Sequence, residues 1–245
     1  MQRYDVIVLG AGAAGMMAGI EAGKRGRRVL VVDHAQSPGE KIRISGGGRC
    51  NFTNTQTRPE RFISGNPKFA ISALRRYTPQ HFIALVERYG IAYHEKALGQ
   101  LFCDGSSQQI INLLTSELGH VGAALALGTT VESVDKGDEG FLVRLSSGPV
   151  GSTSLVIATG GKSIPKMGAT GLGYDLARQF GLAVTETRPG LVPLTCEPGA
   201  LERLKPLAGI SAEVDAEANG RRFREALLFT HRGLSGPAIL QISSY

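Results

Sequence analysis

The first 33 residues constrain the fold more than any other part of the chain. Residues 4–9 read YDVIVL, which is typical of a strand that is buried on both faces. The turn Gly10-Ala11-Gly12-Ala13-Ala14-Gly15 follows directly, and then a helical stretch over 16–24 and an apolar stretch over 28–32 that ends at Asp33. This order of strand, G-x-G-x-x-G, helix, strand and acid predicts the βαβ unit of a Rossmann-like α/β fold.

Each residue type in this unit has a physical reason to be there. Gly10 permits a tight turn, Gly12 lets the backbone approach a pyrophosphate, and Gly15 lets the helix pack closely on the strand. The helix start offers N–H groups and the positive end of its dipole to phosphates. Asp33 can accept hydrogen bonds from ribose hydroxyls. The pattern therefore predicts a dinucleotide and does not distinguish FAD from NAD.

A second glycine-rich block over 40–54 contains Gly46, Gly47 and Gly48 in succession, close to Lys41, Arg43 and Arg49. Consecutive glycines let backbone N–H groups form a concave anion site, to which the three cations add charge. Asn51 and Asn54 could hydrogen-bond a heterocycle or a pyrophosphate. The alternative interpretation is a flexible basic loop without a ligand.

Several segments together resemble the YhiN/BaiN-like family of bacterial flavoproteins, which are NAD(P)/FAD-dependent oxidoreductases and include aminoacetone oxidase. The similar segments are GAGAAG (10–15), KIRISGGGRCNFTN (41–54), GQLFCD (99–104), IATGGKSIPKMGATGLGY (157–174), LVPLT (191–195) and FTHRGLSGPAILQIS (229–243). The resemblance implies an FAD-binding domain of the glutathione-reductase type. It also implies cofactor contacts at Gly10, Gly12, Ala13, Ala14, Gly15, Asp33, His34, Lys41, Ile42, Gly47, Gly48, Arg49, Cys50, Asn51, Val131, Ala158, Thr159, Gly160 and Gly161.

Further elements follow along the chain. Helical spacing of apolar residues predicts helices over 69–77, 79–89, 108–118 and 174–180. Short strands are predicted over 91–94, 100–103, 124–127, 131–134 and 140–145, and a buried strand begins at 154. The strands at 124–127, 131–134 and 140–145 look like the β-meander of glutathione-reductase-type domains. The strand from 154 leads into Thr159-Gly160-Gly161, at the sheet edge where ligands bind.

A composition change near residue 190 predicts two domains. Residues 1–189 would form the FAD-binding domain, and 190–245 the start of a β-rich domain that forms a lid or a substrate chamber over the flavin. Alternating apolar residues over 210–216, the turn Asn219-Gly220 and the stretch 223–229 predict a β-hairpin there. Pro237 opens a helix close to Tyr245, and we expect the natural protein to continue beyond it.

The net charge of +6 is uneven: residues 1–100 contain 15 Lys and Arg against 7 Asp and Glu, and the remainder contains 12 against 14. The basic half should face an anion, either a nucleotide or a nucleic acid. A chain with no tryptophan and 6% aromatic residues is poorly suited to stacking single-stranded nucleic acid. We therefore expect a small-molecule substrate and disfavour a nucleic-acid partner.

Cys50, Cys103 and Cys196 form no C-x-x-C motif and no even-numbered disulfide framework, which favours a cytoplasmic protein. The five histidines show no metal-ligand spacing, and only His231 is a candidate for the substrate side, with a surface role preferred. We expect no metal and no membrane span, because the apolar run at 6–22 is broken by glycines and no other run is long enough. No catalytic acid or base can be named.

Three functions remain open from the sequence. The first is an FAD-dependent oxidoreductase for a small organic substrate, which either oxidises an amine with O₂ or uses NAD(P)H as a transient electron donor. The second is a nucleic-acid-associated flavoprotein that resembles the tRNA-modifying ones. The third is a flavin-binding protein without turnover.

Overall fold

The computed structural model describes all 245 residues, which form two compact units. Unit 1 is Met1–Ala183 and unit 2 is Val184–Tyr245. Their assignment to a cofactor domain and a substrate lid stays a prediction. No helix combines the length and the apolar character that crossing a membrane would require.

Unit 1 contains a six-stranded sheet in the order β6-β2-β1-β9-β8-β7. The central strand β1 (Gln2–Leu9) pairs in parallel with β2 (Val29–Val32) and with β9 (Gly148–Ile157), and β2 pairs in parallel with β6 (Ala124–Ala126). The two outer strands, β8 (Gly140–Leu145) and β7 (Val131–Gly137), continue the sheet beyond β9 in antiparallel fashion. The sheet is therefore parallel at its centre, as the apolar character of its strands predicts.

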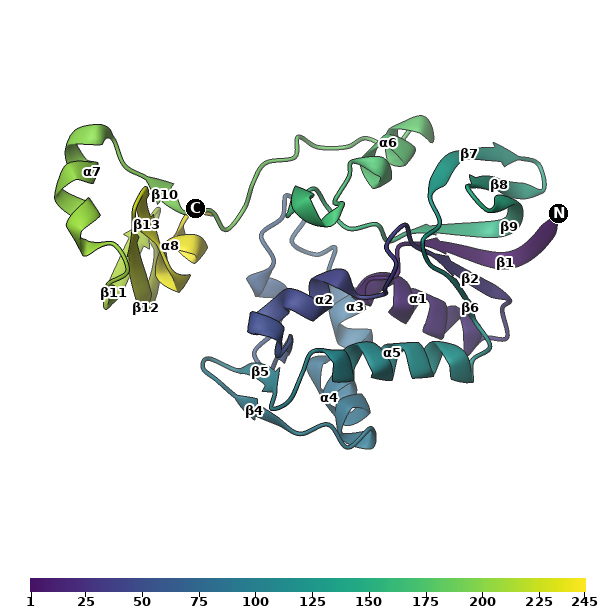
Figure 1. Cartoon of the computed structure of the whole chain (residues 1–245), viewed down its shortest axis with the longest axis horizontal. Helices are drawn as coiled ribbons and strands as arrows, with labels where there is room; N and C mark the ends of the chain where they lie inside the picture. The colour runs from purple at the N-terminus through teal and green to yellow at the C-terminus, as the bar shows by residue number, and fades with distance from the viewer. The chain divides into compact units, whose positions relative to one another are not determined.

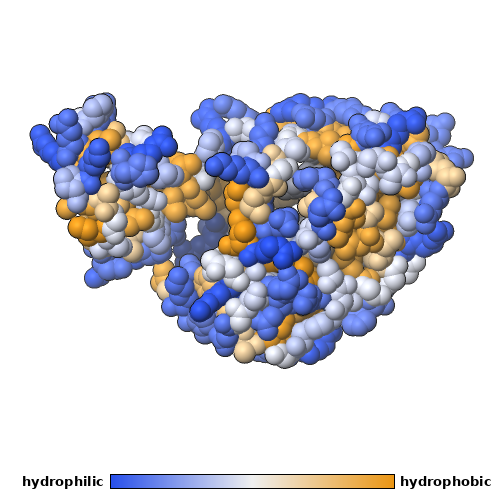
Figure 2. All heavy atoms as spheres, viewed as in Figure 1, coloured by the Kyte–Doolittle hydropathy of each residue, from blue (hydrophilic) through white to orange (hydrophobic).

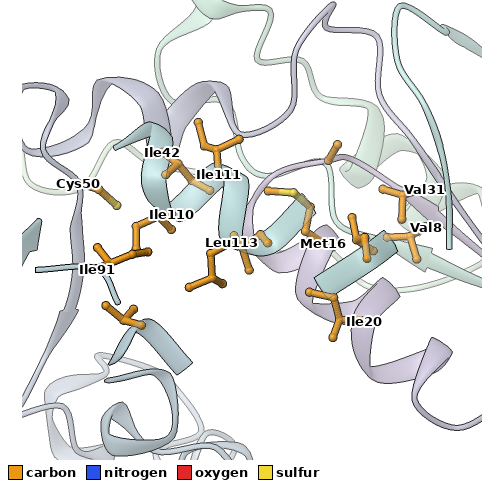
Figure 3. Close-up of a cluster of buried hydrophobic side chains, with 14 of the residues drawn as sticks. Val8, Met16, Ile20, Val31, Ile42, Cys50, Ile91, Ile110, Ile111 and Leu113 are labelled. Atoms are coloured by element: carbon orange, nitrogen blue, oxygen red, sulfur yellow. The ribbon is translucent and has the colours of Figure 1, made fainter. Parts of the chain in front are cut away.

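Both faces of this sheet are covered, which makes unit 1 a layered α/β fold of the Rossmann type (Figure 1). On one face, α1 (Ala13–Gly23) and α5 (Gln108–His120) pack against Val8 and Val31 through a buried cluster that includes Met16 and Ile110 (Figure 3). On the other face, Ile7, Leu9 and Val32 pack with residues of β7, β8 and α6 (Leu172–Gln179). The predicted fold class is thus confirmed.

A further group of short helices and strands lies beside α5. The short helix α2 (Glu40–Ile44) leads into β3 (Asn51–Asn54), which pairs with β5 (Gln100–Cys103), and β5 pairs with β4 (Tyr93–Glu95). The segment between β3 and β4 contains a single 3-10 turn at Pro59–Arg61, then α3 (Ile71–Arg76) and α4 (Pro79–Arg88). Thr78 caps α4, and Pro79 occupies its first turn, which is the position where a missing N–H does no harm.

The predicted three-strand meander needs one correction. Residues 124–126 do not join it: they form β6, which pairs in parallel with β2 through Leu30↔Ala124 and Val32↔Ala126. The preceding helix α5 supplies the crossover that a parallel strand requires. The meander instead consists of β7, β8 and the first half of β9, and β9 begins at Gly148, earlier than the strand predicted from 154.

Unit 2 contains a four-stranded sheet in the order β10-β13-β12-β11. The long pair β11 (Ser211–Ala218) and β12 (Arg221–Thr230) forms the predicted hairpin, in which Asn219 and Gly220 have φ of 48° and 71°. Positive φ at both positions is what a type I′ turn requires. The other elements are β10 (Leu194–Thr195), α7 (Pro198–Leu204), β13 (Gly233–Ser235) and α8 (Pro237–Ile242), whose apolar face is buried on the hairpin.

Figure 2 shows one face of the molecule, on which polar side chains predominate and apolar ones gather in several separate areas. Three of the exposed large apolar residues of unit 1 lie in the connection between the 3-10 turn and α3. Phe62, Ile63 and Phe69 are 47%, 64% and 82% exposed there.

Candidate functional site

The glycine turn lies against the carboxyl end of β9. Gly10 has φ of 109°, and a Cβ at this position would overlap the carbonyl oxygen of Ala158. A Cβ on Gly15 would overlap the carbonyl oxygen of Gly10 and lie 2.9 Å from its carbonyl carbon. Two of the three glycines are therefore required by packing within the protein.

Gly12 has a different environment, because no atom lies within 4 Å of the position of its Cβ. It is the N-cap of α1, and this helix start has no side-chain cap and no acidic residue in the first turn. The N–H groups of the first turn, at Ala13, Ala14 and Gly15, thus have no side-chain acceptor. An open helix N-terminus of this kind suits a phosphate.

Asp33 lies at the end of β2, beside the same turn. Its Oδ2 accepts a hydrogen bond from the Ala11 N–H at 2.6 Å, and its Oδ1 accepts one from the Ala35 N–H at 2.9 Å. Each carboxylate oxygen has lone pairs for a further donor. The carboxylate is therefore held in place by the backbone and can still accept hydrogen bonds from a ligand.

Gly10 and Asp33 line a cleft of about 440 Å³, within the usual size range of small-ligand sites, whereas Gly12, Ala13, Ala14 and Gly15 lie outside its lining. Five of the predicted cofactor residues line it: Gly10, Asp33, His34, Val131 and Thr159. The other lining residues were not predicted from the sequence: Leu9, Val32, Thr129, Thr130, Gly168, Thr170, Gly171, Leu172 and Asp175. The cleft thus extends from the glycine turn, past β2, to the start of β7.

The segment before α6 closes one side of the cleft. Gly168 has φ of 77°, and a Cβ on it would lie 2.5 Å from Nε2 of His34. Nδ1 of His34 lies 3.4 Å from Oδ1 of Asp33. A glycine at 168 therefore lets the chain approach the imidazole that flanks the carboxylate.

Lys41 connects α2 to the loop after β9. Its Nζ donates to Oγ of Ser163 at 2.9 Å and to the Gly161 carbonyl at 3.4 Å. The Gly39 N–H, just before α2, donates to the Ala11 carbonyl at 2.9 Å. These contacts bring Lys41, Gly160 and Gly161 close to the glycine turn, although none of them lines the cleft itself.

The Gly46–Gly48 block lies at the other end of α2. All three glycines have positive φ (59°, 67° and 86°), and so does Cys50 (54°). A Cβ on Gly46 would meet the ring of Phe102 at 2.6 Å, whereas Gly47 and Gly48 face open space. Arg49 and Asn51 are exposed there, and Arg49 forms no ion pair.

Two predicted contacts in this block have buried side chains. Ile42 and Cys50 are 8% and 4% exposed and belong to the hydrophobic core shown in Figure 3, so only their backbones can face a ligand. Arg43, whose proposed contribution to an anion site stays a prediction, also makes contacts within the protein. Its guanidinium donates to Oε1 of Gln108 at 2.6 Å and to the Pro38 carbonyl at 3.3 Å, which ties α2 to α5.

The two buried cysteines are unsuited to nucleophilic chemistry at neutral pH. Burial raises the pKa of Cys50, against a smaller opposing effect of Ser45, and burial raises the pKa of Cys103 to about 11. Both thiols therefore stay protonated at pH 7. No three His, Cys, Asp or Glu side chains are grouped so that they could hold a metal ion.

Comparison with known proteins identifies relatives over the whole chain. A family model described as the HI0933-like protein Rossmann domain matches residues 4–235. Proteins named "Ribosomal RNA dihydrouridine synthase" are 54% identical over 246 residues in Escherichia coli K12 and 46% identical over 251 residues in Haemophilus influenzae. Both alignments cover 100% of this chain and 62% of the relative, so the chain spans less than two thirds of these proteins.

A more distant relative is the "3-dehydro-bile acid delta(4,6)-reductase" of Clostridium scindens, 27% identical over 256 residues, which cover 100% of this chain and 60% of the relative. Among solved structures, glycine oxidase from Geobacillus kaustophilus is similar with a TM-score of 0.52 and 18% identity, over 75% of this chain and 60% of that one. This likeness shows a shared fold.

Proposed function

Because the chain belongs to the HI0933-like Rossmann family, we propose that it is the cofactor-binding part of an FAD-dependent oxidoreductase that acts on ribosomal RNA. The observation that carries the cofactor assignment is the cleft lined by Gly10 and the fixed carboxylate of Asp33, next to the turn that leads into the uncapped start of α1. The names of the two relatives at 54% and 46% identity support the substrate.

The residues of the cleft and of the adjoining glycine turn fit the ADP half of FAD. The first turn of α1 would bind the pyrophosphate, and Gly12 leaves the space that its oxygens need. Asp33 would accept hydrogen bonds from the ribose hydroxyls, and the backbone at Val131 would lie along the adenine.

Beyond the pyrophosphate, the chain offers a second set of groups for the rest of the cofactor. Lys41 brings a positive charge to the edge of the glycine turn, and the open backbone at Gly47 and Gly48 would let a flat ring approach closely. Arg49 and Asn51 are the exposed polar side chains that would bind polar atoms of the ribitol or the ring.

When bound, FAD supplies the two-electron chemistry, with NAD(P)H proposed as the electron donor. Converting uridine to dihydrouridine adds a hydride and a proton across the C5=C6 bond of the base, so one NAD(P)H is oxidised for each base reduced. The residues of this chain hold and orient the cofactor for that reaction.

Reduction of a small organic substrate is the second candidate. It is favoured by the bile-acid reductase relative, whose 27% identity is lower than that of the two synthases. Composition and motifs favour such substrates, whereas the names of the more similar relatives favour RNA.

The test uses the whole protein, purified and examined by its visible spectrum and by chromatography of the heat-released cofactor. We expect bound FAD, and dihydrouridine in a ribosomal RNA transcript incubated with the protein and NAD(P)H, as detected by mass spectrometry of nucleosides. Asp33→Ala should lower FAD affinity, while Asp138→Ala, in the exposed β7–β8 turn, should not. A protein that cannot be loaded with FAD would refute the cofactor assignment, and a loaded protein that leaves the RNA unchanged would refute the substrate.

A further inference from the structure

We propose that the segment Arg58–Tyr77 is the surface of unit 1 that binds RNA, an inference that rests on the proposed function. It runs from the 3-10 turn Pro59–Arg61, through the connection 62–70, to the end of α3. The cleft of the cofactor site does not involve any of these residues.

The first observation is the charge of this surface. The segment contains five cations and one acid, Glu60. The five are exposed: Arg58, Arg61, Lys68, Arg75 and Arg76. None of them forms an ion pair, in contrast to Arg3, Lys24, Arg25 and Arg144. Other exposed cations of unit 1, such as Arg27 and Lys166, are also unpaired, but they lie outside this segment.

Unpaired, exposed cations are free to contact phosphates, and the counterions they displace favour binding to a polyanion. The excess of basic residues in the first hundred positions is therefore partly located here.

The second observation is that the fold brings the two ends of the segment together. Arg58 and Arg75 line the same groove of about 320 Å³, with Pro59, Leu74 and Pro79 among its other residues. Glu60 also lines this groove, so it contains a carboxylate as well as the two guanidinium groups. Two arginines on one groove provide the planar donors that bind phosphate oxygens in bidentate fashion.

The third observation is the apolar character of the connection 62–70, which joins the 3-10 turn to α3. Every residue over 61–69 is exposed, and Phe69 is 82% exposed. Together with Phe62 and Ile63 it places flat or apolar surface in water beside the cations, which is unfavourable unless a partner covers it. Unpaired bases stack on such side chains, and RNA is recognised mainly through splayed single-stranded bases.

The low aromatic content of the chain as a whole argues against such stacking, but it says nothing about local concentration. Phe62, Phe69 and Tyr77 fall within one short basic segment and are all exposed. An enzyme that reduces a base must also draw that base out of the stack, so contacts to the flanking nucleotides are expected. Phosphate and base contacts on one surface would meet this need.

The test measures binding of a ribosomal RNA transcript by the whole FAD-loaded protein over a range of salt concentrations. A five-site variant, R58Q/R61Q/K68Q/R75Q/R76Q, is compared with the charge-matched control R3Q/K24Q/R25Q/R144Q/R178Q, whose cations all form ion pairs. Each phosphate that a cation neutralises on a single strand contributes about 0.7 to the slope of log K against log salt, so the five-site variant should reduce this slope by about 3.5. The control should retain most of the wild-type slope.

Single substitutions test the stacking contribution separately and disturb the fold least. Phe69→Ala should weaken RNA binding about 5- to 150-fold, and Phe69→Trp should preserve it. If the five-site variant loses its FAD spectrum, the pair R58Q/R75Q and Phe69→Ala replace it in the comparison.

The outcomes separate this inference from the proposed function. RNA reduction by the wild type, with the five-site variant and Phe69→Ala binding as tightly as the control, would overturn the binding surface alone. A wild-type protein that contains FAD but neither binds nor reduces RNA would overturn both.

Discussion

Replacing Gly15 with alanine is expected to destabilise unit 1, although alanine normally stabilises a helix. Gly15 is the third residue of α1, where the exchange would gain up to about 1 kcal/mol of helix propensity. However, the added Cβ would overlap the Gly10 carbonyl oxygen and lie 2.9 Å from its carbon. Both are backbone atoms, and Gly10 is itself pressed against Ala158, so the turn cannot move away.

The magnitude follows from these two effects. Overpacking of a rigid site costs about 1–3 kcal/mol, and the overlap with the Gly10 backbone, which itself lies against Ala158, puts this position at the upper end. After subtraction of the propensity gain, the free energy of unfolding should fall by about 2 kcal/mol. For a protein of this size that corresponds to a Tm lower by about 4–8 °C.

The assay is thermal unfolding of the cofactor-free protein, followed by circular dichroism. Gly12→Ala is the matched control, because Gly12 has φ of −78° and no atom within 4 Å of its Cβ position. We expect Gly12→Ala to keep the wild-type Tm but to weaken FAD binding, since its methyl group enters the space assigned to the pyrophosphate. A Tm for Gly15→Ala equal to or above that of the wild type would refute the reasoning.

Two further predictions concern ionisable groups. Burial raises the pKa of Glu117, but hydrogen bonds from Tyr89 and Arg88 outweigh it and hold the pKa below its usual value. Glu117→Gln should therefore lower the free energy of unfolding by about 1.5–3 kcal/mol at pH 7. This difference should shrink as the pH falls below about 4.5, because the carboxyl then becomes protonated. Urea titrations at pH 7 and pH 3 measure it, and an equal difference at both would contradict the assignment. Burial raises the pKa of the Cys103 thiol to about 11, so this thiol should not react with a thiol reagent at pH 8 in the folded protein. The partly exposed Cys196 should react, and peptide mapping after labelling would show the difference.

Local sequence patterns predicted the fold at positions where the residue type itself determines the backbone conformation or the ligand contact. The turn over 10–15 and Asp33 occupy the positions that the glycine spacing predicts, and Asn219-Gly220 forms its hairpin because these residues tolerate positive φ. Residues 124–126 were misassigned because a short apolar strand has the same pattern in a parallel or an antiparallel pair. Only the crossover through α5 determines its partner.

The unpredicted part of the site consists of residues that tertiary structure brings to it. Thr129 and Thr130 precede β7, and Gly168–Leu172 lie between the loop that follows β9 and α6. Their sequences contain no motif by themselves, although 168–172 lie in a block that resembles the family. The positive φ of Gly168 beside His34 is visible only once the two segments are folded together.

The pairing of β1 with β9 also has a consequence for synthesis of the protein. Residues 2–9 have their partners at 150–157, so the first strand emerges long before the strand that completes the sheet around it. At about 5–20 residues per second, the interval on the ribosome is roughly 7 to 30 s. During this time the apolar edge of β1 is unpaired, and the glycine turn lacks Ala158, against which it packs. Nascent chains that end before residue 157 should therefore depend on chaperones to avoid aggregation.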